Sequence, residues 1–457
     1  MQVIVPQHKI TFSALGEQSF QSDTKYRRTK YLLTLSVPDG MLIYNALTAE
    51  LLLLDGEEIS VFNAPDKADE GQLLPLVKKW VLVPEAHDDL KLSRQFADIM
   101  LLLNRSRVGM PQNRFTILPT TDCNARCFYC YELACNRRNM SERTARDVAD
   151  YIIRKCDKSR KVSIRWFGGE PLYNSEAIDI ICDGLAAAGI DYGGNMISNG
   201  YLFGKETVAR AKEKWHISWV QITLDGTEEI YNRTKAYIYK NSGSAFSRVL
   251  DNIGHLLDAG IAVHARMNMD DHNEDDLFKL TDMLIERFGK YSHFYLYANL
   301  LFEEDGSHAA SHSAEIRHAL TEKHMKLRKY ISDSGHGIRN VMTVNDRSTH
   351  CMADRDDSAL ILPDGNLGKC EHFTDDNYYG SIYSDDVDLD VINRFKDTDV
   401  VVPGKCDKCE LRPQCVVLKS CLILPRRCDE VDKKFMVFDL ETKMRLAYEY
   451  FKKENKL

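Results

Sequence analysis

Three cysteines stand close together at Cys123, Cys127 and Cys130, in the spacing Cys-x3-Cys-x2-Cys. Three thiolates on one short loop can hold three irons of a [4Fe–4S] cluster. The fourth iron is then open to a substrate or a cofactor. A structural zinc ion is the alternative, but such sites use four protein ligands. We therefore expect an iron–sulfur site with one open iron.

A second group of cysteines lies within residues 351–428. Seven thiolates cannot close two four-thiolate sites, which need eight, so one of two such sites would lack a thiolate. A pair of structural zinc sites is the alternative, because Cys-x2-Cys pairs also occur in zinc ribbons. The seven residues are Cys351, Cys370, Cys406, Cys409, Cys415, Cys421 and Cys428.

Composition and compartment favour metal ligation over disulfides. The chain has 457 residues, 13 cysteines and a net charge of −8, which argues against binding nucleic acid through bulk positive charge. The N-terminus lacks a basic segment followed by a long apolar one, and no stretch reaches the length of a membrane span. We therefore expect a cytoplasmic protein without membrane association, whose thiols are reduced and free to bind metal.

The elements that must position these residues alternate along residues 114–300. Six strand-like runs are separated by helical patterns, which indicates βα units and a parallel sheet. Chemistry in such sheets collects at the carboxyl ends of the strands. The expected strands are 115–118, 162–167, 195–198, 219–224, 261–266 and 294–297, and one helix is expected to begin at Ser141.

Polar motifs follow these strands. The second strand leads into Gly168-Gly169-Glu170-Pro171, where glycines let the backbone approach a ligand closely and Glu170 can accept from an ammonium. The third leads into Ser198-Asn199-Gly200, and the fourth ends in Thr223-Leu-Asp225-Gly226.

With these motifs, residues 111–300 resemble the radical S-adenosylmethionine (SAM) enzymes. In that family the cysteine loop binds a [4Fe–4S] cluster, SAM chelates its open iron, and one electron cleaves SAM to a 5′-deoxyadenosyl radical. The fold implied is α/β, a partial (β/α)6 barrel. Lysine stands at 235 where the family usually has arginine; it can pair only as a point charge, and Arg233 is the alternative. The SAM-binding residues implied are Tyr129, Gly168, Gly169, Glu170, Ser198, Asn199, Thr223, Asp225, Lys235 and Arg266.

The later cysteines resemble the SPASM extension of peptide-modifying radical SAM enzymes. Thirteen residues separate Cys351 from Gly365 and four separate Gly365 from Cys370, as in that extension, whereas five residues precede Cys421 where three are usual. The resemblance implies two auxiliary [4Fe–4S] clusters, three clusters in all. The fourth ligand of the three-thiolate cluster is water, His350, another cysteine or a substrate thiolate. The ligand sets are Cys351, Cys370 and Cys421 for one cluster, and Cys406, Cys409, Cys415 and Cys428 for the other.

The N-terminal residues show strand-like runs at 31–37 and 41–44 and helical patterns at 73–80 and 87–103. This order resembles the winged-helix-like module that recognises leader peptides by adding them to a sheet edge; a structural cap is the alternative. His308, His312, His318 and His324 are expected in a solvated helix and loop. The predicted domains are the recognition module (1–110), the barrel (111–312), a bridging helix region (313–350), the SPASM domain (351–430) and a C-terminal helix (431–457).

The resulting prediction is a radical SAM oxidoreductase that matures a ribosomally made precursor peptide. Its radical would abstract a hydrogen and lead to an intramolecular thioether or carbon–carbon cross-link. No residue is identified as a protein acid or base. The expected partners are a precursor peptide with a leader and a flavodoxin- or ferredoxin-type electron donor. The alternatives are a formylglycine-forming dehydrogenase, a peptide epimerase, and a non-catalytic iron–sulfur or zinc scaffold.

Overall fold

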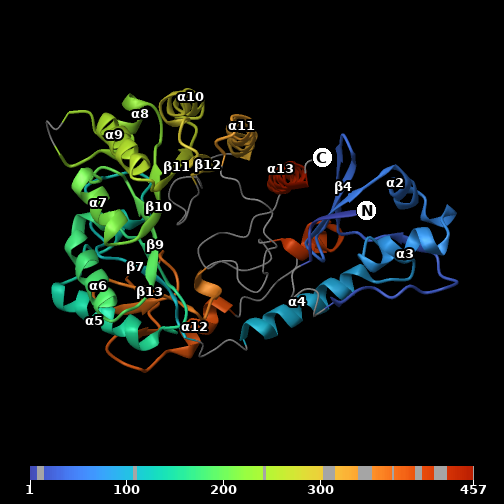
Figure 1. Ribbon diagram of the computed structural model, residues 1–457, viewed down its shortest axis with the longest axis horizontal. Helices are drawn as coiled ribbons and strands as arrows, with labels where there is room; N and C mark the ends of the chain where they lie inside the picture. The colour runs from blue at the N-terminus through green and yellow to red at the C-terminus, as the bar shows by residue number, and fades with distance from the viewer. Residues whose placement is uncertain are drawn as a thin grey trace.

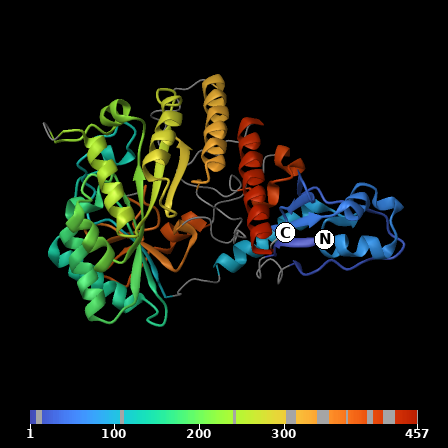
Figure 2. The same ribbon diagram turned by 45° about the horizontal axis from the view of Figure 1, so that its top comes forward.

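The structure is a computed structural model that describes residues 1–7, 15–105, 111–239, 243–301, 314–337, 352–372, 375–396, 404–415 and 430–455. Cys351, Cys421, Cys428, His308, His312 and His350 lie outside the described residues. The described elements form a large α/β lobe and a smaller N-terminal lobe, with α11 (Ala314–Asp333) and α13 (Glu430–Asn455) between them (Figures 1 and 2).

The described part of the α/β lobe contains six parallel strands that neighbour one another in chain order, as the sequence predicts. Helices follow each strand and cover one face of the sheet (Figure 1). The strands are β7 (Arg114–Ile117), β8 (Val162–Trp166), β9 (Tyr192–Ser198), β10 (Ile217–Thr223), β11 (Ala262–Met269) and β12 (Phe294–Leu300). The helices are α5 (Glu142–Lys155), α6 (Ser175–Ala187), α7 (Lys205–Glu213), α8 (Glu228–Lys235), α9 (Ala245–Asp258) and α10 (Asp276–Phe288).

Local sequence explains these elements. Ser141 caps α5 by accepting the Thr144 N–H, which confirms the predicted helix start. Along β10, Val220 and Ile222 are fully buried in the core whereas Trp219 and Gln221 are only half-buried. Because side chains alternate across a strand, the half-buried residues point to the face that the helices leave open.

Part of the cysteine-rich segment joins this sheet, which the sequence does not predict. β13 (Ser358–Ile361) pairs parallel to β7, and β14 (Asn366–Gly368) and β15 (Gly380–Ser381) extend the sheet antiparallel. Leu360 and Ile361 are fully buried. This part of the cysteine-rich segment thus shares the core of the barrel sheet. A short helix, α12 (Leu389–Lys396), follows.

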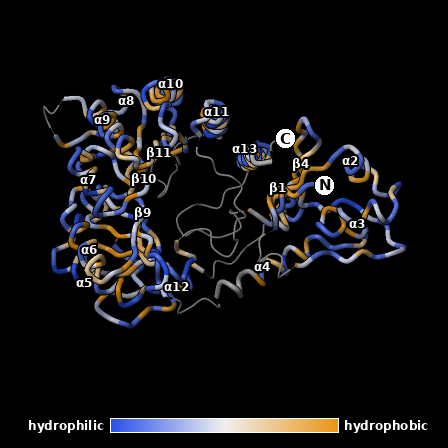
Figure 3. The backbone as a smooth tube through the Cα atoms, in the orientation of Figure 1, coloured by the Kyte–Doolittle hydropathy of each residue, from blue (hydrophilic) through white to orange (hydrophobic). Residues whose placement is uncertain are grey.

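The N-terminal lobe holds a four-stranded antiparallel sheet in the order β1-β5-β4-β3. The strand at residues 50–54 is not predicted from the sequence, because its leucines do not alternate with polar residues. Figure 3 shows apolar residues gathered along β1 and β4. The sheet comprises β1 (Gln2–Val5), β3 (Leu32–Val37), β4 (Gly40–Asn45) and β5 (Glu50–Leu54); beside it lie the pair β2 (Tyr26–Arg28) and β6 (Leu82–Pro84), and the helices α2 (Gly56–Asn63), α3 (Glu70–Lys78) and α4 (Asp89–Arg105).

The two faces of this sheet pack differently. Ile43 and Leu52 face α2 and α3, whereas the opposite face packs against α13 through Met444, Ala447 and Tyr448. The last helix of the chain is therefore part of the N-terminal lobe's core. None of the described helices is long and apolar enough to cross a membrane.

Helix α11 packs against α13 and carries a histidine whose burial contradicts the prediction from the sequence. His324 is 3% exposed, not solvated. Its Nε2 lies 2.7 Å from the Ala298 carbonyl oxygen of β12, and its ring stacks on Phe435 of α13 at 5.3 Å between centroids. The helix is polar in composition, but this side of it is covered by α13.

Candidate metal and cofactor site

The loop that follows β7 carries Cys123, Cys127 and Cys130. Burial, reinforced by nearby acidic groups, raises the pKa of the Cys123 and Cys130 thiols to about 12 and also raises the pKa of Cys127. Buried thiols of this kind need a cation to become thiolates, so metal binding here would release protons. The Cys123 sulfur already accepts the Ala125 N–H at 3.3 Å.

Two glycines allow the loop after β8 to lie close against this cysteine loop. Gly168 has φ +115°, and a Cβ there would lie 2.2 Å from the Thr120 carbonyl oxygen. A Cβ on Gly169 would lie 2.2 Å from the Asp122 carbonyl oxygen. Neither position tolerates a side chain without moving backbone, so the glycines are needed for the close approach of the two loops.

Glu170 ties the loop after β8 to the loop after β9. Its carboxylate is fully buried and accepts from Ser198 Oγ at 2.9 Å, Asn199 N at 2.8 Å and Leu172 N at 3.2 Å. Burial raises the pKa of Glu170 to about 7, although these donors oppose the rise. A ligand ammonium placed here would favour the charged carboxylate.

Lys235 forms a closed cluster with two other predicted site residues. Its Nζ lies 2.9 Å from Asp225 Oδ2 and donates to the Tyr129 hydroxyl at 2.9 Å, and that hydroxyl donates to Asp225 Oδ2 at 2.8 Å. Burial opposes its charge, yet Asp225 holds the pKa of Lys235 well above its ordinary value. Lys235 is thus the counter-ion of Asp225. Arg233 is exposed on α8 and does not replace it.

Two buried polar atoms beside the cysteine loop have no hydrogen-bond partner within the part of the chain that the structure describes. They are Asp225 Oδ1, an acceptor, and Asn124 Nδ2, a donor. Asn124 lies between Cys123 and Cys127 and accepts from Asn199 Nδ2 at 2.7 Å. Buried polar groups are normally paired, so this donor and acceptor indicate a polar ligand. Asn124 is not among the residues predicted from the sequence, although its place inside the cysteine motif is a signal.

Thr223 and Arg266 stand opposite each other in the register of β10 and β11. Arg266 donates from Nε to Asn268 Oδ1 at 2.8 Å. Both predicted residues lie near the carboxyl ends of their strands, at the same edge of the sheet as the cysteine loop.

The described members of the second cysteine group lie in two places. Cys370 follows β14, where the ring of nearby His372 lies 4.2 Å from that of Tyr131 in the cysteine-loop segment. Arg138 strengthens this junction by pairing with Asp364 at 2.7 Å and Asp375 at 2.9 Å. Cys370 therefore belongs to a segment held against the first cysteine loop.

Cys406, Cys409 and Cys415 lie instead in residues 404–415, which pack on the N-terminal lobe. Leu411 is buried in that lobe's core, and the buried Arg412 donates to Ser93 of α4 at 3.0 Å. Cys370 therefore packs with the α/β lobe, whereas Cys409 packs with the N-terminal lobe.

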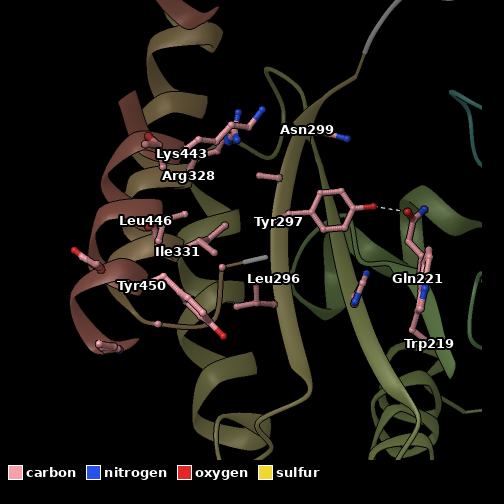
Figure 4. Close-up of a pocket in the computed structure, with 18 residues that line it drawn as sticks. Trp219, Gln221, Leu296, Tyr297, Asn299, Arg328, Ile331, Lys443, Leu446 and Tyr450 are labelled. Atoms are coloured by element: carbon pink, nitrogen blue, oxygen red, sulfur yellow. Dashed lines mark hydrogen bonds between the residues drawn. The ribbon is translucent and has the colours of Figure 1, made fainter. Parts of the chain in front are cut away.

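A cavity of about 590 Å³ lies beside the edge strand β12 (Figure 4). Trp219, Gln221 and Tyr297 line it from the open face of the sheet, and Arg328 and Tyr450 line it from α11 and α13. It therefore links the inner face of the sheet with the two helices between the lobes.

Residues 117–284 match the family described as Radical SAM superfamily. Over 64 residues the chain is 36% identical to an uncharacterized protein of Methanocaldococcus jannaschii, and the match covers 14% of this chain and 21% of that protein. The chain thus spans about a fifth of the length of this curated relative.

Solved structures share the fold. Native anSMEcpe with bound AdoMet and Cp18Cys peptide has a TM-score of 0.56 at 16% identity, covering 74% of this chain and 99% of that chain. Native anSMEcpe with bound AdoMet has a TM-score of 0.58 at 15% identity, covering 74% and 99%. Streptococcus suis SuiB bound to precursor peptide SuiA has a TM-score of 0.49 at 14% identity, covering 85% and 94%. The anSMEcpe likeness extends over nearly all of that protein and shows a shared fold, and residues 117–284 are the part of this chain that matches the Radical SAM superfamily.

Proposed function

We propose that the chain is a radical SAM oxidoreductase that modifies a peptide. The observation that carries this proposal is the buried site in which Glu170, Asn199 and Asp225 surround the cysteine loop with unpaired polar atoms beside it. A SAM-bound [4Fe–4S] cluster on Cys123, Cys127 and Cys130 would supply a 5′-deoxyadenosyl radical that abstracts a substrate hydrogen.

The residues around the loop suit the parts of SAM. Glu170 would accept from the methionine ammonium, positioned by Ser198 and Asn199. Asp225 offers its free Oδ1 to a hydroxyl while Lys235 neutralises it and Tyr129 orients it. Thr223 and Arg266 would contact the carboxylate or ribose, and the Gly168-Gly169 turn brings the backbone close.

A peptide substrate is supported by the fold. The chain shares it with anSMEcpe, whose structure contains the Cp18Cys peptide. The product would be an intramolecular thioether or carbon–carbon cross-link. The second cysteine group would hold two auxiliary [4Fe–4S] clusters that take up the released electron, and a flavodoxin- or ferredoxin-type protein would reduce the first cluster.

The N-terminal sheet offers an edge for a leader peptide. In the described residues β3 pairs only with β4, with Leu32 opposite Asn45. The Tyr31 carbonyl accepts the Ala46 N–H at 2.7 Å, so Tyr31 begins the series of residues bonded to β4. Hydrogen-bonded pairs alternate in an antiparallel ladder. The backbone groups that point to the open edge are therefore those of Leu32, Thr34 and Ser36.

Proline substitutions test this edge. Thr34→Pro removes an N–H that faces outward, so it should weaken binding of the leader encoded in the neighbouring small open reading frame at least about tenfold. Leu35→Pro removes a bond to β4 and should destabilise the sheet, and Thr34→Val should bind normally. Unchanged leader affinity in a folded Thr34→Pro protein would leave the module as a structural cap.

Anaerobic reconstitution with iron, sulfide, SAM and reductant tests the reaction. The wild type should form 5′-deoxyadenosine, and Cys127→Ala should not. A scaffold without turnover would form none in either case. With a precursor peptide, a cross-link removes two hydrogen atoms from the peptide, epimerisation leaves its mass unchanged in ordinary water, and formylglycine formation generates an aldehyde. Mass spectrometry separates these outcomes.

A further inference from the structure

Arg165 stands on the open face of the barrel sheet, where it has no acidic partner among the described residues. Its neighbours Ile164 and Trp166 are buried in the core, so the alternating Arg165 side chain points to the opposite face. It is half-buried, and its Nε donates to Asn195 Oδ1 at 3.3 Å. Within the described ranges, no carboxylate lies at ion-pair distance from it.

Two other half-buried arginines of the described residues have carboxylate partners. Arg138 pairs with Asp364 and Asp375, and Arg355 pairs with Asp357. A partly desolvated guanidinium costs free energy unless an anion or several acceptors satisfy it. Arg165 uses one of its five N–H donors on the Asn195 amide. As far as the described residues show, its terminal nitrogens have no partner and can take a bidentate acceptor.

Aromatic side chains continue this face toward β12. The Trp219 and His264 rings stack at 4.7 Å and 12°, and His264 meets Tyr295 edge-on at 5.3 Å. Tyr297 donates to Gln221, as Figure 4 shows. Burial lowers the pKa of His264, so the stack is neutral at pH 7. Burial raises the pKa of Tyr297 to about 12, against the opposing charges of Arg266 and Arg165. In the register of the sheet Arg165 stands opposite Asn195, and Asn195 stands opposite Trp219, so Arg165 lies two strands from the aromatic stack in the same cross-strand row.

We propose that this face is a subsite for a carboxylate of the peptide substrate, with Arg165 as its receptor and the Trp219–His264 stack as the platform for an adjacent residue. This inference rests on the proposed peptide-modifying function. Arg165 precedes Gly168 by three residues, roughly 10 Å along a strand. A carboxylate held by Arg165 would therefore lie closer to the amino ends of the strands than the proposed SAM site does. A few residues of extended peptide can span the distance from there to the reacting position.

The carboxylate belongs to an Asp or Glu side chain or to the C-terminus of the peptide. The test uses the anaerobically reconstituted full-length protein with SAM and fluorescein-labelled random decapeptide pools. The pools have Glu or Gln fixed at the centre, and each is made with a free or an amidated C-terminus. Anisotropy titrations measure the dissociation constants for wild type, Arg165→Gln, Arg165→Lys and Lys161→Gln. Lys161 is an exposed cation just before the same strand, paired with Asp191, and serves as the matched loss of charge.

The wild type should bind the Glu pool, or the free-acid pool, about tenfold tighter than its amide counterpart, because a charge-assisted bidentate pair is worth about 1.4 kcal/mol or more. Arg165→Gln should abolish that preference, Arg165→Lys should keep part of it, and Lys161→Gln should keep all of it. Iron content and 5′-deoxyadenosine formation without peptide report that each variant is loaded.

If the wild type binds the acid and amide pools equally well, the carboxylate subsite is refuted, whereas the proposal that the protein binds peptides is retained. A full preference retained by Arg165→Gln overturns the role of Arg165. If no pool binds and peptides do not change 5′-deoxyadenosine formation, both the subsite and the peptide-modifying function fail. Which wild-type preference appears, Glu over Gln or acid over amide, identifies the source of the carboxylate.

Discussion

At the scale of single residues, the site depends on charges placed where water is nearly absent. Asp225 and Lys235 have side chains only 2% and 3% exposed. Each makes the other's burial tolerable, and Tyr129 bonds both. Losing one partner of such a pair is costlier than losing both, because a buried charge is then left without compensation.

Lys235→Met should therefore lower the free energy of unfolding by about 3–5 kcal/mol, measured by urea denaturation of the metal-free protein. The double variant Lys235→Met/Asp225→Asn should recover a large part of this loss. Equal stability of the single variant and the wild type would show that the pair is not buried as described.

Glu170→Gln keeps the size and much of the hydrogen bonding of a fully buried carboxylate but removes its charge. If Glu170 receives the SAM ammonium, the variant should bind SAM about tenfold more weakly, since hydrogen bonds to charged groups are worth about 1.5–3 kcal/mol. Anaerobic equilibrium dialysis with the reconstituted protein measures this. The exposed Glu176→Gln is the control, and equal affinities in both variants would exclude the role.

At the scale of elements, the seam between α11 and α13 joins the two lobes. Lys434 pairs with Glu322 at 2.9 Å, Asp439 pairs with Arg328, and Phe435 contacts His324. Burial lowers the pKa of His324 to about 4 from an ordinary 6.5, and the charge of Arg328 adds to the effect. The folded protein therefore keeps this histidine neutral.

Between pH 6.5 and about 4 the unfolded chain binds a proton at His324 that the folded chain does not. Stability should fall as pH falls through this window, by on the order of 3 kcal/mol in total, and change no further through this group below it. The difference in thermal stability between wild type and His324→Phe, followed against pH, isolates the effect. Parallel stability curves for wild type and His324→Phe would refute the prediction.

At the scale of the whole molecule, segments that are far apart in the sequence pack together. Helix α13 covers the sheet of the N-terminal lobe, with Met444 fully buried and Tyr448 bonded to Asp39 of the β3–β4 turn. Residues 404–415, with three of the predicted cluster cysteines, are held on the same lobe. If these cysteines bind a cluster as the sequence predicts, its loading would be coupled to folding of the N-terminal lobe.

Met444→Lys would place a charge against the apolar sheet and should destabilise the N-terminal lobe by about 3 kcal/mol or more. Hydrogen exchange of the β4 and β5 amides measures the loss, and those of β8 to β10 should be little changed. Met444→Leu, which keeps the apolar volume, should cost less than about 1.5 kcal/mol. Uniform exchange changes in both lobes would contradict this.

The sequence by itself determined the parts that depend on short spacing. The Cys123–Cys130 motif, the alternation of strands and helices, and the cap at Ser141 are local, and the parallel sheet follows from them. The glycine turn and Glu170 could be placed beside the cysteine loop because carboxyl ends of parallel strands meet at one edge.

Only the tertiary structure decided which distant residues meet. The pairing of β13 with β7, the burial of His324 under Phe435, and the cover of the first sheet by Met444 each join segments far apart in the chain. Such contacts leave no periodic trace in the sequence, because burial of a side chain depends on the partner that packs over it. For the same reason the sequence predicts that Lys235 can pair as a point charge, whereas only the fold identifies Asp225 as its partner.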